Sequence, residues 1–274
     1  MTCSKTFTGD IPELTYDILK YLHDDYSTLH SCDLVDRLWC RLAIPLLWEN
    51  PFSIATGNRN FIEIYLRNLD GDLKTRLNEY EINDNSLFSN TLFNYPRFLK
   101  YLNTDKILCS VWKWFDYSSK RGNKDSFSSM CSVSDFGKLI YTSIFNENEV
   151  VLHIFEIDIS DTNNKYYGTY YDNIFELILQ NKNFFRNIKY LNLYIDDSYE
   201  DDLGDNTDSY TLIKNRMLQI INLHQNLKKL LIDNNNLSLY QSLLLSKVSN
   251  FSNTLNTIIL FYVDFKNMVI GQSS

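Results

Sequence analysis

Histidine and cysteine are the side chains of this sequence that could act as nucleophiles, general bases or metal ligands. No C-x-x-C pair, G-x-S-x-G elbow, H-E-x-x-H helix or glycine-rich phosphate loop places them at a working spacing. The sequence therefore predicts no catalytic residue, no cofactor, no metal site and no enzyme, although dispersed residues could still meet in three dimensions. The residues concerned are His23, His30, His153, His224, Cys3, Cys32, Cys40, Cys109 and Cys131.

Carboxylates are concentrated in one run, from Asp196 to Asp208, where they could bind a cation. The run lacks the glycine and glutamate positions of an EF-hand loop, so a solvated loop is favoured and calcium binding is the alternative. The densest basic run, Lys120 to Lys124, is short, and a solvated loop is favoured there too. The net charge is −8 and the pI is about 5.0, which disfavours a nucleic-acid partner, because phosphates need a basic footprint.

Nothing in the sequence indicates a membrane or secreted protein. No apolar run approaches the roughly 18 residues that cross a bilayer, and MTCSKTFTGD at the start lacks the basic and apolar regions of a secretory signal. Five cysteines cannot all pair, which indicates a reducing compartment. We therefore expect no membrane partner and a cytoplasmic or nuclear location.

The elements that would position functional side chains begin with about three short helices between Ile11 and Trp48. Apolar residues recur there three and four residues apart, which is helical spacing. Pro12 suits a first helical turn, Ser27 or Thr28 is a candidate N-cap for the next helix, and Pro45 is expected to break or restart the last one. The two apolar stripes are Ile11, Leu14, Ile18 and Leu22, then Leu29, Cys32, Val35, Leu38, Trp39 and Leu42.

The stretch LVDRLWCRLAIPLLWEN, from Leu34 to Asn50, holds two tryptophans and much aliphatic surface. Some forty residues bury too little surface to be more than marginally stable alone. Such a unit needs a second surface to cover its apolar side chains. That surface is either another protein, which would make the unit a docking module, or the core of the larger domain that follows.

Several positions in this segment match a known motif. They are Ile11-Pro12-Glu13-Leu14, then Ile18-Leu19, Leu22, Leu29, Val35, Trp39 and Leu47-Trp48. The pattern resembles an F-box, with isoleucine where the family usually begins Leu-Pro. The resemblance implies that residues 8–53 form a three-helix domain, which docks on a Skp-type adaptor of a cullin–RING ubiquitin ligase.

The same resemblance implies a set of partner-binding residues. By analogy Ile11, Pro12 and Leu14 face the adaptor, while Trp39 and Trp48 either pack the helices or touch the partner. The full set is Ile11, Pro12, Leu14, Ile18, Leu22, Leu38, Trp39 and Trp48.

The remainder, residues 54–274, predicts an α/β domain in which helices and strands alternate, most clearly from residue 150 onward. Glycine and proline are scarce, with 8 and 4 in the whole chain, which disfavours a turn-dense all-β sandwich. Helices are expected at 61–69, 94–103, 107–115, 136–145, 174–181, 211–223 and 237–248. Strands are expected at 150–159, 188–195, 227–233 and 255–263.

Three of these strands share one spacing. The first two copies are Leu227-x-x-Leu230-x-Ile232-x-x-Asn235-x-Leu237 and Leu255-x-x-Ile258-x-Leu260-x-x-Val263-x-Phe265, and the weaker third is Ile188-x-x-Leu191-x-Leu193-x-x-Asp196. The copies start 39 and 28 residues apart, and the acidic run lengthens the first step. The pattern resembles a leucine-rich repeat, whose stacked strands line a concave surface. A generic parallel α/β sheet is the alternative.

The two resemblances together indicate a protein of the F-box/leucine-rich-repeat family, with an irregular repeat solenoid after the F-box-like unit. Such a protein would be the substrate-recognition adaptor of an SCF-type ubiquitin ligase, whose repeats capture an unknown target protein. The acidic run after Tyr194 could favour basic targets, although a solvated loop remains the simpler interpretation. The alternative function is a repeat-type protein-interaction module that works outside any ligase.

Overall fold

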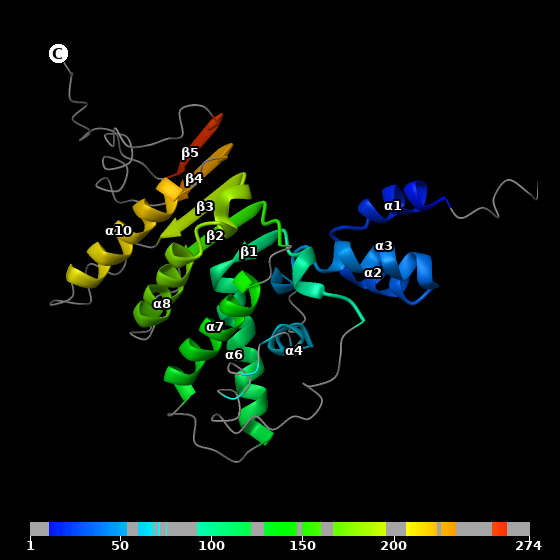
Figure 1. Cartoon of the computed structure of the whole chain (residues 1–274), viewed down its shortest axis with the longest axis horizontal. Helices are drawn as coiled ribbons and strands as arrows, with labels where there is room; N and C mark the ends of the chain where they lie inside the picture. The colour runs from blue at the N-terminus through cyan, green and yellow to red at the C-terminus, as the bar shows by residue number, and fades with distance from the viewer. Residues whose placement is uncertain are drawn as a thin grey trace, which may run out of the picture.

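A parallel sheet with helices packed along it, joined to a small helical unit, makes up the fold (Figure 1). The computed structural model describes residues 11–53, 60–67, 69, 71, 75, 92–121, 129–146, 150–159, 167–195, 207–223, 226–233 and 254–261. These residues contain helices and a five-stranded parallel sheet, so the expected α/β class is confirmed.

The helical unit begins and ends its helices with local signals. Asp25 caps the second helix, since its Oδ1 accepts a hydrogen bond of 3.0 Å from the backbone N–H of Thr28. Asp36 caps the third helix in the same way. The expected cap at Ser27 or Thr28 is therefore wrong, and the third helix continues through Pro45 rather than breaking there. The helices are α1 (Pro12–Lys20), α2 (Tyr26–Asp33) and α3 (Arg37–Leu47).

The strands lie side by side in chain order and all run parallel. Each strand is entered in the same way: a backbone carbonyl just before one strand accepts hydrogen bonds from two successive N–H groups of the next. The carbonyls of Lys100, His153, Lys189 and Lys228 all do this, with N–O distances of 2.8 to 3.1 Å. The strands are β1 (Tyr101–Asn103), β2 (Ile154–Ile159), β3 (Tyr190–Ile195), β4 (Lys229–Asp233) and β5 (Thr257–Phe261).

Sequential strand order decides where the helices lie. Each strand is followed in the sheet by the next strand of the chain, always in the same direction. Connections between parallel strands have the same handedness, so the helices of such connections lie on the same face of the sheet. In Figure 1, α8 and α10 accordingly follow the same side of the strands. The helices of this part are α4 (Asn60–Arg67), α6 (Thr104–Arg121), α7 (Ser129–Asn146), α8 (Tyr167–Gln180) and α10 (Thr207–Leu223), with 3₁₀ turns η2 (Pro51–Ser53), η4 (Tyr95–Phe98) and η6 (Phe184–Asn187).

The core lies between the helices and one face of the sheet. In β2, the alternate residues Phe155, Ile157 and Ile159 are buried, and the residues between them are only half-buried. The strand register aligns Phe155 with Leu102, Leu191, Leu230 and Ile258 across the whole sheet. The expectation that Leu191, Leu193 and Ile195 share the inner face of one strand is confirmed, and so is the buried helix stripe of Phe136, Leu139, Ile140 and Ile144.

One expected element is wrong. Residues 94–103 were expected to be helical, but they form the short turn η4 followed by β1. The expected helix at 237–248 and the repeat positions Asp196, Asn235, Leu237, Val263 and Phe265 lie outside the described residues.

The helical unit is joined to the β1 end of the sheet. The carbonyl of Glu49, just after α3, accepts hydrogen bonds of 3.0 Å from the N–H groups of both Lys100 and Tyr101, as the carbonyls between strands do. Lys100 also forms an ion pair with the Glu49 carboxylate. The unit thus continues the backbone pattern of the sheet at this end, across the predicted boundary at residue 53.

Candidate docking surfaces

An apolar stripe lies along the outer side of α1. Ile11, Leu14 and Ile18 are 45, 50 and 49% exposed, although their side chains are apolar. The helix does not need them for its own attachment, because Leu19 on another side of α1 is completely buried and belongs to the core. We call Ile11, Leu14 and Ile18 the α1 stripe.

The eight residues implied as partner-binding differ in how accessible they are. Pro12 is exposed together with the α1 stripe. Leu22, Leu38 and Trp39 are half-buried, and of these Leu22 and Trp39 pack against the core. Trp48 is only 5% exposed, so its side chain has little surface to offer a partner.

Trp48 fills the junction between the helical unit and the next elements. Its ring centroid lies 4.7 Å from that of Phe61 in α4 and 4.3 Å from that of Tyr95 in η4. The ring of Tyr65 lies 6.1 Å away. Of the two roles left open for this tryptophan, packing is therefore the one that its surroundings match.

Sequence reasoning named no partner role for the turn between α2 and α3. Leu34 and Val35 in this turn are 75 and 60% exposed. The predicted helical stripe includes Val35 but not Leu34, and the position of the turn places both on the surface. Asp36 is the sequence signal that could have located this turn, because aspartate is a strong N-cap residue and marks the start of a new helix.

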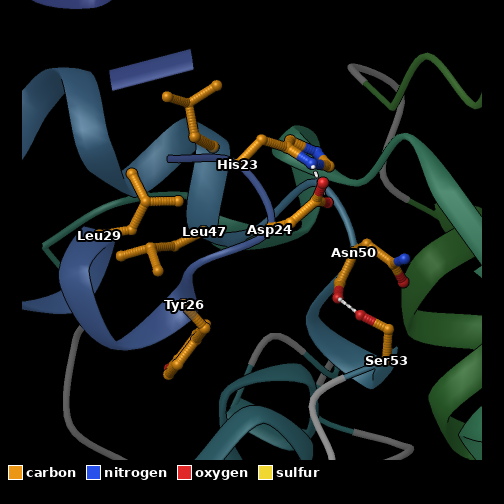
Figure 2. A pocket seen from close by; sticks show the side chains of 8 residues that line it. His23, Asp24, Tyr26, Leu29, Leu47, Asn50 and Ser53 are labelled. Carbon is orange, nitrogen blue, oxygen red and sulfur yellow. Dashed lines mark hydrogen bonds and ion pairs between the residues drawn. The ribbon is translucent and has the colours of Figure 1, made fainter. Parts of the chain in front are cut away.

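A cavity of about 290 Å³ lies within the helical unit (Figure 2). His23 in its wall could act as a base: its Nδ1 lies 3.1 Å from a carboxylate oxygen of Asp24 and its Nε2 lies 3.5 Å from one of Glu49. The nearby hydroxyl of Ser53 donates to the carbonyl of Asn50 instead of to the histidine. The cavity therefore holds no nucleophile–base pair among the residues that line it, which are His23, Asp24, Tyr26, Leu29, Leu46, Leu47, Asn50 and Ser53.

The described cysteines are poor nucleophiles. Burial raises the pKa of the Cys32 and Cys40 thiols, with Asp33 adding to the effect in both cases. Burial and then Asp105 raise the pKa of Cys109. A raised pKa keeps these thiols protonated near neutral pH. Within the part of the chain that the structure describes, no three His, Cys, Asp or Glu side chains gather as metal ligands, and no helix is long and apolar enough to span a bilayer.

The sheet presents a second surface, on the face opposite to the core. Its apolar side chains Ile154 and Ile259 are partly exposed and lie outside the core cluster, and Leu231, also outside that cluster, is 9% exposed. We call this surface the open sheet face. By strand alternation and register it consists of Tyr101, Asn103, Ile154, Glu156, Asp158, Tyr190, Asn192, Tyr194, Lys229, Leu231, Asp233, Thr257, Ile259 and Phe261.

Glu156 organises the β1 side of the open sheet face. Its carboxylate accepts hydrogen bonds from the hydroxyl of Tyr101 and from the amide groups of Asn103 and Asn192. The Oδ1 of Asn103 in turn accepts a hydrogen bond from the backbone N–H of Lys106, at the start of α6. Polar side chains from three strands are therefore held in fixed positions.

Two residues further along each strand, the register-paired side chains of the open sheet face form a second row, and Tyr194 lies at its centre. The register places it directly between Asp158 on β2 and Asp233 on β4. Burial raises the pKa of the Tyr194 hydroxyl, and the nearby carboxylates of Glu156, Asp158 and Asp233 raise it further. The three carboxylates are thus close enough to one phenol ring for their charges to act on it together.

No known protein family matches the chain, and no curated protein and no solved structure shows significant similarity to it.

Proposed function

We propose that this protein is the substrate-recognition adaptor of an SCF-type ubiquitin ligase, working in the cytoplasm or nucleus. In this proposal the helical unit is an F-box that docks on a Skp-type adaptor through the α1 stripe. The sheet and its helices form a leucine-rich-repeat-like array that captures a target. The protein itself carries out no covalent step, and it acts by holding the target near a ubiquitin-loaded enzyme, which raises the effective concentration of the target.

The observation that carries the first part is the α1 stripe itself. Three large apolar side chains stay half-exposed on a helix that is already anchored by Leu19. Burying the exposed half of such a side chain contributes about 1 kcal/mol, so the stripe alone would supply about 3 kcal/mol. Micromolar affinity corresponds to about 8 kcal/mol. A docking partner must therefore also cover further apolar surface of the helical unit, where Pro12, Leu34 and Val35 are exposed and Leu38 is half-buried.

The strand register supports the repeat interpretation. Leu191, Leu230 and Ile258, which hold the same position in the three sequence copies, are direct neighbours across β3, β4 and β5. Two further segments fall in the same alignment, with Leu152-x-x-Phe155-x-Ile157 at β2 and Leu99-x-x-Leu102 at β1. Each segment contributes one strand to a sheet that grows in chain order, which is the arrangement of a solenoid.

Binding of the full-length protein to a purified Skp-type adaptor, measured by calorimetry, tests this proposal. Leu14→Asp should weaken binding by ~30-fold or more, because a charge replaces an apolar contact at the centre of the interface. The matched control is Lys20→Glu, which adds negative charge to α1 outside the stripe. Equal affinity for the wild type and Leu14→Asp, or no binding by the wild type, would contradict the adaptor role. The second outcome would favour an interaction module that works outside a ligase.

A further inference from the structure

The open sheet face carries an excess of negative charge, and aromatic side chains lie beside its carboxylates. Its described residues include the carboxylates Glu156, Asp158 and Asp233 but one cation, Lys229. Two of the carboxylates flank Tyr194 in the register, and Phe261 lies next to Asp233 on β5. A row of carboxylates and aromatic rings is suited to a guanidinium or ammonium group, which can pair with the carboxylates and stack on the rings.

We propose that the open sheet face binds a segment of a partner protein that carries arginine or lysine. Its cation lies over Tyr194 between Asp158 and Asp233. The inference deepens the proposed function, because it names the chemistry of the segment that a ligase target would present. A protein of net charge −8 also attracts basic partners over a longer range.

The geometry of the face favours an ordered complex. The side chains of Tyr101, Asn103 and Asn192 are already tied to Glu156 by hydrogen bonds. In addition, the hydroxyl of Tyr171 on α8 donates a hydrogen bond of 2.6 Å to the carbonyl of Asp158, which fixes the backbone of β2 at the row of Tyr194. Groups that are held in place before binding lose less conformational entropy when the partner arrives.

An acidic or phosphorylated segment is the competing occupant, because lysines precede several strands. Lys100, Lys189 and Lys228 occupy equivalent positions in neighbouring strand entries. However, each of these lysines lies two residues before a core-facing residue, Leu102, Leu191 or Leu230, so strand alternation places it on the core side and not on the open sheet face. Lys100 is also paired with Glu49. The charge that projects from the face itself is thus mainly negative.

Fluorescence anisotropy with three labelled twelve-residue peptides tests the inference on the full chain. All three have a Gly-Ser background, and they carry four arginines, four glutamates or four phosphoserines. The arginine peptide should bind best, and the double variant Asp158→Asn with Asp233→Asn should weaken it by ~10-fold or more, because two charge pairs are lost. Tyr194→Leu should also weaken it, whereas Tyr194→Phe keeps the ring and most of the affinity.

The matched control removes two carboxylates from other surfaces, with Asp17→Asn on α1 and Glu176→Gln on α8. If this control weakens the arginine peptide as much as the Asp158/Asp233 variant does, the attraction is non-specific and the inference fails. Stronger binding of the glutamate or phosphoserine peptide, lost in Lys189→Ala with Lys228→Ala, would also overturn it. Thermal unfolding of each variant checks that the fold is kept.

Adaptor binding in the same variants separates this inference from the proposed function. Asp158→Asn with Asp233→Asn should leave binding to the Skp-type protein unchanged, and Leu14→Asp should leave peptide binding unchanged. Adaptor binding without arginine-peptide binding would refute the inference alone. Peptide binding without adaptor binding would refute the ligase role and keep the open sheet face as a site for basic segments.

Discussion

The α1 stripe and the open sheet face are both accessible surfaces, but they differ in how the chain keeps them accessible. The stripe consists of apolar side chains on a helix that Leu19 already attaches to the core. The open sheet face consists mostly of polar and aromatic side chains that neighbouring strands partly shield and hydrogen bonds hold in place. The first surface can gain from burial and the second from charge pairing, so the two proposed docking surfaces differ in their chemistry.

The largest expected effect concerns the residue that joins the two regions. Trp48→Ala should lower the free energy of unfolding by about 3–5 kcal/mol, because it leaves a cavity between α3, α4 and η4. Denaturant unfolding followed by far-ultraviolet circular dichroism measures the loss. If the two regions fold as one unit, adaptor binding and peptide binding should disappear at the same denaturant concentration.

Trp39→Ala is the control for this prediction, since Trp39 lies half-buried in α3, the helix that Trp48 follows, and its removal should cost less. A Trp48→Ala variant with wild-type stability would show that the junction contributes little. Loss of adaptor binding well before peptide binding would mean that the helical unit and the sheet unfold separately, and the comparison between the two surfaces would then concern two independent domains.

A smaller effect is expected in the helix layer behind the sheet. A Cβ atom at Gly137 of α7 would lie 2.5 Å from a ring carbon of Tyr170 in α8, too close for the helices to keep their spacing. Gly137→Ala should therefore destabilise the protein by about 1–3 kcal/mol, although alanine favours a helix more than glycine does. The melting temperature, or the midpoint in urea, measures the change.

Gly71→Ala is the matched control, because no heavy atom lies within 4 Å of a Cβ at that position. The control should be neutral or stabilising. Because the substituted position is in the helix layer, Gly137→Ala should leave adaptor affinity unchanged at temperatures where the protein is folded. A stabilised Gly137→Ala variant would contradict the close packing of α7 on α8.

The α1 stripe could be predicted from the sequence more completely than the open sheet face. Spacings of three and four identify one side of a helix, and of the predicted stripe Ile11, Leu14 and Ile18 are exposed together, whereas Leu22 lies beyond the end of α1 and packs against the core. Period-two alternation separated Leu191 and Leu193 from Asn192 and Tyr194 equally well. However, alternation alone does not say that α8 and α10 follow the same side of the sheet, and without that information the polar side of each strand has no assigned role.

The errors in the sequence reasoning also have physical causes. β1 is only three residues long, and its hydrogen bonds go to Glu49 and to β2, both far away in the sequence. No local pattern in residues 94–103 reveals such partners. The segments at Leu99 and Leu152 were not recognised as repeat copies, because they start 53 residues apart and Thr104 stands in β1's copy where the others have an aliphatic residue. Trp48 matched the motif by position, but its burial depends on aromatic rings from α4 and η4.

The smallest expected effect is a pH dependence at the strand entries, where the helical unit meets the sheet. Burial lowers the pKa of His153, and the neighbouring positive charges of Lys189 and Lys100 lower it further. The unfolded chain, with an ordinary histidine pKa of about 6.5, therefore binds a proton before the folded chain does. The contribution to stability is complete above pH 6.5 and is lost as the pH falls through 6.5 toward the lowered folded pKa.

The variants His153→Gln and Lys189→Gln test this assignment of the pH dependence. Between pH 7.5 and 5, the wild type should lose more unfolding free energy than His153→Gln, which has no titrating group at this position. Lys189→Gln removes the larger of the two charge effects, so an NMR titration should find the pKa of His153 raised toward its ordinary value. An unchanged pKa in Lys189→Gln would mean that burial and the remaining charges, rather than Lys189, set the protonation of His153.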